Sequence, residues 1–433
     1  MIGSSAVHPR DGRWSSNRTH GPADAMIRRT RVKVTTTGPV GGPRRIAFYS
    51  HDTQGLGHIR RNITLAAAMS AGEDCDILLL TGNPEATTLP LPDRTDVVTL
   101  PTVAKDKRGR YAARVMGSSL RRITAMRSGI IDAALRAFDP DVLVVDKAAG
   151  GVCGELEPVL ARLRAAGRTR TVLGLRDILD EPDVVHREWR DQRTVETITA
   201  FYDQVWVYGD RDVHDLTAEH PLVGAVGDRV VFTGYLGEGR ADGLRPRVRT
   251  EQRVRPPAGP YVLGLVGGGQ DGLAVAEAFA GARPPAGHSA VLVTGPYLPR
   301  RHRERLRALA AGRTDLQLLE FIPDADEFIA GAAAVVSMAG YNTVCELLQA
   351  RVPALLVPRV IPRREQWIRA ERLAARGACD LLDPALLTAD TLTTWLATAV
   401  SRPATDAAPI DLSGLHRVPG LCASLLQEAH RAA

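Results

Sequence analysis

Lysine is almost missing from this 433-residue chain. The Lys and Arg total of 55 includes four lysines, Lys33, Lys105, Lys107 and Lys147, so the net charge of +6 is carried by arginine. Much of that arginine lies in predicted loops rather than along one face. Net charge by itself reports on solubility and non-specific attraction. We therefore expect no nucleic-acid partner.

Cysteine and long apolar runs are scarce as well. The five cysteines are scattered and never spaced as Cys-x-x-Cys, which argues against a disulfide framework and a zinc site. No apolar run approaches the roughly 20 residues of a membrane span, and residues 1–43 lack the apolar core of a secretory signal. We expect a cytoplasmic protein whose residues 1–43 form a disordered basic extension, with Met26 as an alternative start.

A metal-binding motif is also hard to find. Asp-x-Asp, which binds a metal in some sugar-transferring enzymes, occurs in four unrelated contexts, so its presence says little. The four pairs are Asp74/Asp76, Asp139/Asp141, Asp210/Asp212 and Asp324/Asp326. Asp324 is predicted to cap a helix over 327–331. We expect no required metal or cofactor.

What the chain has in abundance is short apolar runs alternating with segments of helical period. Strands are predicted at residues 46–50, 77–80, 97–100, 142–145, 171–175 and 205–208, and again at 261–266, 290–294, 316–321, 334–337, 354–357 and 379–382. Predicted helices include 59–70, 155–166 and 114–138, the last with Ile123, Met126, Ile130 and Ala134 on one face. This alternation is typical of an α/β fold with parallel sheets.

The length exceeds what one core usually fills, so two domains are expected. The pattern breaks over 237–259, a stretch rich in arginine and proline that we interpret as a linker. The predicted domains are Rossmann-like halves over 44–236 and 260–402, facing a cleft. Residues 403–433 form a tail with a helix over 421–432, which either folds back onto the first half or is a loosely packed terminus.

In each half, a glycine-bearing loop follows the first predicted strand. In the first, Gly55 and Gly57 precede His58, without the Gly-x-Gly-x-x-Gly pattern of dinucleotide folds. His58 is either a cap or a base that takes a proton from an acceptor hydroxyl. The second loop, with Gly267, Gly268, Gly269 and Gln270, precedes a helix over 273–279 and predicts a diphosphate site made of backbone amides.

A third turn lies after the predicted strand 334–337. Ser337, Gly340, Asn342 and Thr343 place small and polar residues where a helix begins. Glu346 lies about one and a half turns into that helix. Its carboxylate is either a solvated surface group or the acceptor for two ribose hydroxyls.

Together these residues resemble the two-domain GT-B glycosyltransferases. The resemblance covers residues 44–400 and is strongest to family 28, which contains the peptidoglycan enzyme that adds N-acetylglucosamine to a lipid-linked acceptor, and to related uncharacterised predicted glycosyltransferases. The family binds its nucleotide sugar in the second domain. Met338, Ala339, Glu365 and one extra residue in the loop at 267–272 depart from the family pattern.

The resemblance implies a role for individual residues. Phe321 and Ile322 correspond to the pair that contacts the base, Gly340 and Thr343 to the diphosphate turn, and Glu346 to the ribose-binding acid. Glu365, Gln366 and Arg369 correspond to residues that touch the donor sugar. Gly55, Gly57 and His58 are similar to the family's first glycine-rich loop and its histidine.

The first half carries weaker signals at two further strand ends. Asp146 and Arg176 are predicted to line the acceptor side of the cleft, and Asp177 is a second candidate for the catalytic base. The alternative for these residues is a cap or a surface ion pair.

The sequence therefore predicts an inverting, metal-independent glycosyltransferase. Its donor is a nucleoside-diphosphate sugar, with a UDP-linked hexose or N-acetylhexosamine favoured, and its acceptor is a small molecule, a glycan or a lipid-linked molecule. The alternatives are a nucleotide-sugar 2-epimerase of the same architecture and a non-catalytic nucleotide-sugar-binding protein. The basic residues 105–110, with Arg114, Arg121, Arg122 and Arg127, suggest peripheral contact with the inner face of an anionic membrane, or else a solvated face.

Overall fold

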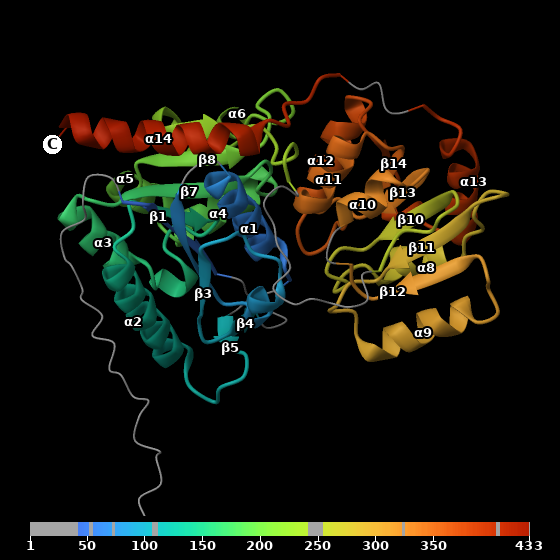
Figure 1. Cartoon of the computed structure of the whole chain (residues 1–433), viewed down its shortest axis with the longest axis horizontal. Helices are drawn as coiled ribbons and strands as arrows, with labels where there is room; N and C mark the ends of the chain where they lie inside the picture. Colours follow the sequence, from blue (N-terminus) through green and yellow to red (C-terminus); the bar gives the residue numbers. More distant parts are fainter. Residues whose placement is uncertain are drawn as a thin grey trace, which may run out of the picture. The chain divides into compact units, whose positions relative to one another are not determined.

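The computed structural model describes residues 42–51, 55–71, 74–105, 111–240, 254–322, 325–403 and 408–432. They contain two large sheets, coloured blue to green and yellow to orange in Figure 1. The first has the strand order β3-β2-β1-β6-β7-β8-β9 and the second β12-β11-β10-β13-β14-β15. Each neighbouring pair in both sheets is parallel. The predicted α/β class with parallel sheets is confirmed.

The strands and helices fall close to their predicted places. The first sheet contains β1 (Arg44–Ser50), β2 (Cys75–Thr81), β3 (Thr95–Thr99), β6 (Val142–Asp146), β7 (Arg170–Arg176), β8 (Gln204–Tyr208) and β9 (Val230–Phe232). Its main helices are α1 (Gly57–Ser70), α2 (Leu120–Phe138), α3 (Glu157–Ala166), α4 (Pro182–Asp191), α5 (Thr194–Phe201), α6 (Leu216–Glu219) and α7 (Pro221–Gly224).

The second sheet is built in the same way. Its strands are β10 (Tyr261–Leu265), β11 (Ser289–Val293), β12 (Leu316–Leu319), β13 (Ala334–Ser337), β14 (Ala354–Leu356) and β15 (Asp380–Leu381). The helices are α8 (Leu273–Gly281), α9 (Arg300–Ala310), α10 (Ala325–Ala330), α11 (Tyr341–Ala350), α12 (Glu365–Ala375), α13 (Ala389–Ala399) and α14 (Gly414–Ala432). None of the helices in the described residues is both long and apolar enough for a bilayer crossing.

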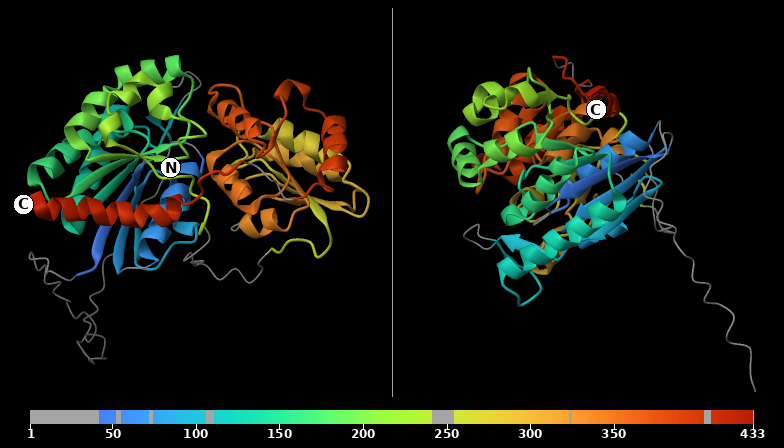
Figure 2. Two further views of the ribbon diagram at one scale, coloured as in Figure 1. Left: turned by 90° about the horizontal axis from the view of Figure 1, so that it is seen from above. Right: turned by 90° about the vertical axis from the view of Figure 1, so that its left-hand side faces the viewer.

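Both faces of the first sheet are buried. Along β1, Ile46 and Phe48 join one core cluster, whereas Ala47 and Tyr49 join another. Successive side chains of a strand point to opposite faces, so each cluster lies on its own side of the sheet. Helices lie on both sides of this sheet in Figure 2. Burial on both faces explains why the strands are short, continuous apolar runs.

The prediction of a long helix over 114–138 is wrong about where the helix starts and about which of its faces is buried. It begins at Leu120, because the chain before it forms an antiparallel pair, β4 (Val103–Lys105) with β5 (Tyr111–Ala113). Met126 is 38% exposed, and the buried stripe instead contains Arg127, which is fully buried. Its guanidinium donates to both carboxylate oxygens of Glu155 at 2.6 and 2.7 Å.

This ion pair shows why the apolar pattern was misleading and why Arg127 does not belong to a basic outer face. A charged residue is buried only when a partner compensates its lost hydration, and Glu155, 28 positions away, could not be matched to it from sequence. Residues 106–110 and Asp324 lie outside the described residues. Helix α10 begins at Ala325, two residues before its predicted start.

Helix α14, red in Figure 1, packs against α1 of the first half. The segment that precedes α14 is hydrogen-bonded to the end of the first half. Leu236 and Ser413 form an antiparallel bridge, and the amide of Tyr235 donates to the carbonyl of Asp411 at 2.8 Å. Arg417 of α14 then donates to the carbonyl of Thr233 at 2.6 Å. The helix starts at Gly414, earlier than the predicted 421, and runs past Pro419.

The strand orders also fix where a ligand can bind. In each sheet, successive strands are first added on one side of the first strand and then on its other side. The order therefore reverses between β1 and β6 and between β10 and β13. Ligands of open α/β sheets bind beyond the carboxyl ends of the strands at such a reversal. The loops after β1, β10 and β13 carry several of the predicted site residues, and Asp146 is the last residue of β6.

Candidate functional site

A cavity of about 230 Å³ lies at these strand ends and is lined by both halves of the chain. From the first half it takes Leu56, Gly57, His58, Arg60, Arg61 and Arg176. From the second it takes Leu265, Gly267, Gly268, Val293, Gly295, Pro296, Phe321, Ile322, Ala325, Gly340, Tyr341, Asn342, Thr343 and Glu346. Most of the predicted donor residues therefore lie in one cavity together with Gly57 and His58 of the first glycine loop.

The glycine loop after β10 contributes backbone to the cavity, but not along its whole length. Gly267 and Gly268 line it, whereas Gly269 is buried against the loop after β11. Gly269 has φ +88°, and a Cβ there would lie 2.3 Å from the carbonyl oxygen of Thr294. Packing therefore requires this glycine, whatever the loop binds. Gln270 is exposed and does not line the cavity.

The turn after β13 presents the start of helix α11. Gly340 is the N-cap residue, and a Cβ there would meet nothing within 4 Å. The first amides of a helix lack intrahelical partners and carry partial positive charge, which favours an anion. Ser337 lies behind this turn and donates to the carbonyl of Leu265, so its hydroxyl supports the loop rather than the cavity.

Asn342 and Thr343 both line the cavity from the first turn of α11. The Asn342 side chain donates to the carbonyl of Gly57 at 3.0 Å, which connects α11 to the first glycine loop. Its Oδ1 is buried and has no hydrogen-bond partner among the described residues. Phe321 and Ile322 form part of the apolar wall, with Phe321 39% exposed and Ile322 buried.

Glu346 is one of the cavity's charged groups and is only 4% exposed. Its Oε1 accepts from Arg60 of α1 at 3.0 Å and from Arg240 at 3.3 Å. A solvated surface carboxylate is therefore excluded. The same acid that sequence analysis linked to ribose is compensated by two arginines from outside its own half.

His58 and Asp146 form the chemical centre of the first half. His58 Nδ1 lies 2.6 Å from Asp146 Oδ2, and Arg61 donates to both oxygens of the same carboxylate at 2.5 and 2.7 Å. Burial opposes ionisation of Asp146, but Arg61 and His58 outweigh it and hold the pKa of Asp146 well below its usual range. An ionised carboxylate accepts hydrogen bonds only, so His58 Nδ1 carries the proton of this hydrogen bond. In the neutral imidazole the lone pair then lies on Nε2.

Arg61 was missed by sequence analysis although it follows His58 by three positions. Residues three apart on a helix share a face, so His58 and Arg61 both reach Asp146 while Arg60 points to Glu346. That spacing was a usable signal. Arg240 offered none, because it lies in the predicted linker.

Arg176 lines the same cavity from the end of β7. Burial lowers the pKa of its guanidinium, and its Nε has no hydrogen-bond partner among the described residues. With Arg60 and Arg61, it gives the lining three arginines against one carboxylate, Glu346. The lining therefore favours an anionic ligand.

Four further predicted site residues, Asp177, Arg369, Glu365 and Gln366, form ion pairs or hydrogen bonds outside the cavity lining. Asp177 is 2% exposed and is bound at both oxygens by Arg369, at 2.6 and 2.8 Å, while the Tyr235 hydroxyl donates to it at 3.0 Å. Arg369 also donates to the carbonyl of Ala339. Both residues are absent from the cavity lining. We therefore correct the assignments of Asp177 as a base and Arg369 as a sugar contact to a buried ion pair that joins the two halves.

The other two belong to the start of α12. Glu365 pairs with Arg359 at 2.5 Å, and the Gln366 side chain accepts from the Arg359 amide at 3.1 Å. Neither lines the cavity, and Glu365 is 4% exposed. Gly55 likewise does not line it, and its carbonyl accepts a hydrogen bond from the Asn83 side chain at 2.9 Å. Among the described residues no group of three or more His, Cys, Asp or Glu side chains is arranged to bind a metal.

A second cavity, of about 270 Å³, is lined by α12 and by the region around α6. It contains His214 and His220, which are 5% and 2% exposed and whose ring nitrogens have no hydrogen-bond partner among the described residues. Burial, reinforced by the neighbouring His214, lowers the pKa of His220 to about 4. Burial also lowers the pKa of His214, against the charges of Glu219 and Asp177.

These histidines predict a loss of stability in mild acid. In the unfolded chain an imidazole takes its proton near pH 6.5, whereas folded His220 stays neutral down to about pH 4. The unfolded state therefore binds more protons as the pH falls from about 6.5 to 4, and the folded state loses stability there. The expected loss from His220 is about 2 kcal/mol between pH 7 and pH 5.

Urea unfolding at pH 7, 6 and 5 measures this loss. His220→Gln should reduce the difference between pH 7 and pH 5, whereas His186→Gln, an exposed histidine on α4, should leave it unchanged. An equal pH dependence in wild type and His220→Gln would show that His220 does not stay neutral in the folded chain.

Known proteins resemble the chain in sequence and in structure. Residues 265–418 match the glycosyltransferase family 28 C-terminal domain. A curated relative from Mannheimia succiniciproducens, UDP-N-acetylglucosamine–N-acetylmuramyl-(pentapeptide) pyrophosphoryl-undecaprenol N-acetylglucosamine transferase, is 37% identical over 78 residues. That match covers 18% of this chain and 22% of the relative, so the chain spans about a fifth of the relative's length.

Two solved structures resemble nearly the whole chain. A putative UDP-N-acetylglucosamine 2-epimerase from Listeria monocytogenes has a TM-score of 0.57 at 13% identity, covering 90% of this chain and 98% of the other. The spinosyn forosaminyltransferase SpnP has a TM-score of 0.54 at 15% identity, covering 89% and 95%. At these identities the likeness concerns the fold. The chain thus has the two-sheet fold of GT-B glycosyltransferases, and its residues 265–418 resemble the C-terminal domain of family 28.

Proposed function

We propose that the chain is a glycosyltransferase that binds a nucleoside-diphosphate sugar in the 230 Å³ cavity. The observation that carries the proposal is the combination found there: exposed backbone at Gly267, Gly268 and Gly340, the start of α11, and the buried carboxylate of Glu346. Backbone amides and a helix N-terminus suit a diphosphate. A carboxylate beside them suits the hydroxyls of the adjoining ribose.

The proposed donor is a UDP-linked hexose or N-acetylhexosamine. Its support is the family match over residues 265–418 and the similarity to the curated relative, which is named as a UDP-N-acetylglucosamine transferase. Phe321 and Ile322 provide the apolar wall for the base. The proposed acceptor is a hydroxyl of a small molecule, a glycan or a lipid-linked molecule that approaches from the His58 side.

The proposed reaction is a displacement with inversion. His58 Nε2 takes the proton of the acceptor hydroxyl, the acceptor oxygen forms a bond to the anomeric carbon, and the bond from that carbon to the diphosphate oxygen breaks. The diphosphate leaves with the electron pair and its added charge. Arginine side chains and the start of α11 stabilise that charge, so the proposal needs no bound metal.

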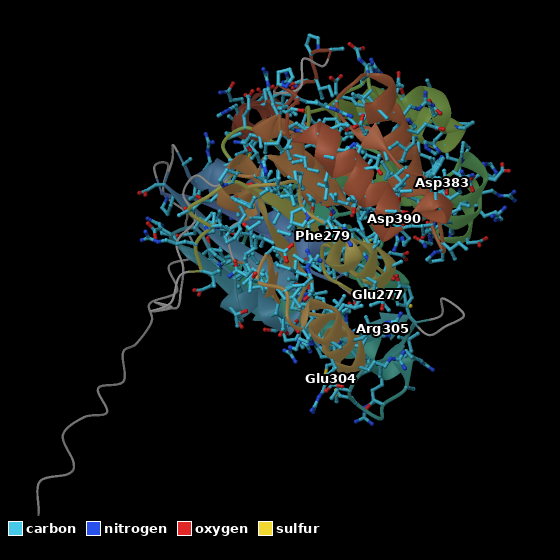
Figure 3. The ribbon with its side chains drawn as sticks, turned by 90° about the vertical axis from the view of Figure 1, so that its right-hand side faces the viewer. Glu277, Phe279, Glu304, Arg305, Asp383 and Asp390 are labelled. Carbon is cyan, nitrogen blue, oxygen red and sulfur yellow. The ribbon has the colours of Figure 1, made fainter. Side chains whose placement is uncertain are left out.

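The role of Glu346 predicts a loss of ribose discrimination. In wild type, 2′-deoxy-UDP should bind about tenfold or more weakly than UDP, because a hydrogen bond to a charged group contributes about 1.5–3 kcal/mol. In Glu346→Gln, UDP should bind more weakly, and the difference in affinity between UDP and 2′-deoxy-UDP should fall to about threefold or less. Calorimetric titration measures both affinities, and Glu277→Gln on α8, labelled in Figure 3, is the matched control.

Unchanged discrimination in Glu346→Gln would contradict the ribose assignment. The reaction itself is tested by incubating the donor with chelator, alone and with candidate acceptors. Complete conversion of the donor without an acceptor would favour the alternative of a nucleotide-sugar 2-epimerase. The similarity in fold to the putative 2-epimerase from Listeria is the reason to test it. Binding with neither conversion nor transfer would favour a non-catalytic binding protein.

A further inference from the structure

Arg60 has the most accessible guanidinium among the arginines that hold the two acids of the site. Its side chain is 32% exposed, whereas Arg61 is 1% and Arg240 4% exposed. Arg61 is bound to both oxygens of Asp146. Within the described part of the chain, the guanidinium of Arg60 makes a single hydrogen bond, from Nη2 to Glu346 Oε1.

Glu346 does not depend on Arg60 for charge compensation. Arg240 donates to the same oxygen through Nε at 3.3 Å, and its Nη1 is fixed by the carbonyl of Leu236 at 3.1 Å. Removing a buried acid's sole partner costs several kcal/mol. Because Arg240 would stay in place, Arg60 can leave without that cost.

A nucleoside-diphosphate donor would change the balance at Arg60. The ribose hydroxyls would donate to Glu346 and compete with Arg60 for its oxygens. The diphosphate would lie at Gly267, Gly268 and Gly340, which line the same cavity as Arg60. A guanidinium binds phosphate through two parallel hydrogen bonds, and such charge-assisted bonds are stronger than a half-exposed ion pair.

We propose that Arg60 exchanges partners when the donor binds, leaving Glu346 to the ribose and binding the diphosphate. The inference rests on the proposed function and adds to it that the first half supplies a positioning residue for the donor's phosphates. Arg60 follows His58 by two positions on α1. The same helix would therefore hold the leaving group and the base.

The exchange has opposite effects on two ligands. Uridine has the ribose but no phosphate, so Arg60 only competes with it for Glu346. UDP adds the diphosphate, with which Arg60 would pair. The ratio of the uridine Kd to the UDP Kd therefore isolates the phosphate contact, since any general damage to the site acts on both ligands.

Calorimetric titration of the full chain with uridine and with UDP tests the proposal. In Arg60→Gln, uridine should bind as in wild type or a few-fold more tightly, UDP should bind at least tenfold more weakly, and the ratio should fall at least tenfold. Arg60→Lys keeps the charge but lacks the two parallel donors of the guanidinium, so its ratio should lie between those of Arg60→Gln and wild type. Arg305→Gln breaks an exposed pair with Glu277 between α9 and α8 (Figure 3) and should leave the ratio unchanged.

Equal weakening of both ligands in Arg60→Gln would show that Arg60 only supports Glu346, and it would overturn the exchange. Tighter binding of both would reduce Arg60 to a competitor and would also overturn it. A wild-type chain that binds neither UDP nor guanosine or thymidine diphosphate would overturn the proposed function together with the exchange. Wild-type UDP binding with an unchanged ratio in Arg60→Gln would overturn the exchange alone.

Discussion

Replacement of His58 by glutamine is expected to lower kcat at least about 100-fold, because a positioned general base contributes roughly 10²–10⁴ to a rate. Asp146 accepts a hydrogen bond from His58 Nδ1, which places the lone pair of the neutral imidazole on Nε2, the proposed base. Glutamine keeps a polar side chain of similar length but cannot take the proton. Single-turnover kinetics with a saturating donor would measure the chemical step directly.

The same variant separates catalysis from binding. UDP affinity in His58→Gln should stay within about threefold of wild type, because the phosphate and ribose contacts are proposed for other residues. His186→Gln, on the exposed face of α4, is the control for replacing a histidine. Retained turnover in His58→Gln would mean that another group takes the proton.

The second large effect concerns stability. Asp177→Asn is expected to lower the free energy of unfolding by about 3–5 kcal/mol, since it leaves Arg369 buried without an anion. Thermal melting and urea denaturation measure the loss. The paired replacement Asp177→Leu with Arg369→Met should lose less than Asp177→Asn alone, because it removes both charges and leaves neither one buried without a partner.

This prediction decides between two roles for Asp177. A catalytic base in an open cleft could be replaced by asparagine with normal stability and almost no turnover. The buried ion pair predicts the reverse: a clear loss of stability, with turnover per folded molecule remaining measurable. A fully stable but inactive Asp177→Asn would restore the role that the sequence suggested.

Much of the proposed donor site could be predicted because its elements are local. A strand, a small-residue turn and a helix lie next to one another in the chain, so Gly267, Gly340 and Glu346 could be placed at strand ends before any contact was known. Parallel strands bring their carboxyl ends to one edge, which is why these turns share a cavity. The position of Phe321 and Ile322 in the cavity wall also followed from the resemblance to family 28.

The position of Glu365, Gln366, Arg369 and Asp177 outside the cavity lining could not be predicted, for the opposite reason. A polar residue beside a site can face a ligand or a buried partner, and the sequence pattern is the same in both cases. Arg369 and Asp177 are 192 positions apart, and only the packing of α12 against the loop after β7 pairs them. The same holds for Arg127 with Glu155, whose burial contradicted an apolar helix face.

The sequence alone determined the α/β class, the two series of parallel strands and the glycine turns at the strand ends, because these depend on periodicity and glycine within short segments. Only the tertiary structure decided which charges meet: His58 and Arg61 on Asp146, Arg60 and Arg240 on Glu346, and Arg369 on Asp177. The reason is that a charge loses its hydration on burial and must find a partner in space, and nothing in the order of residues specifies that partner.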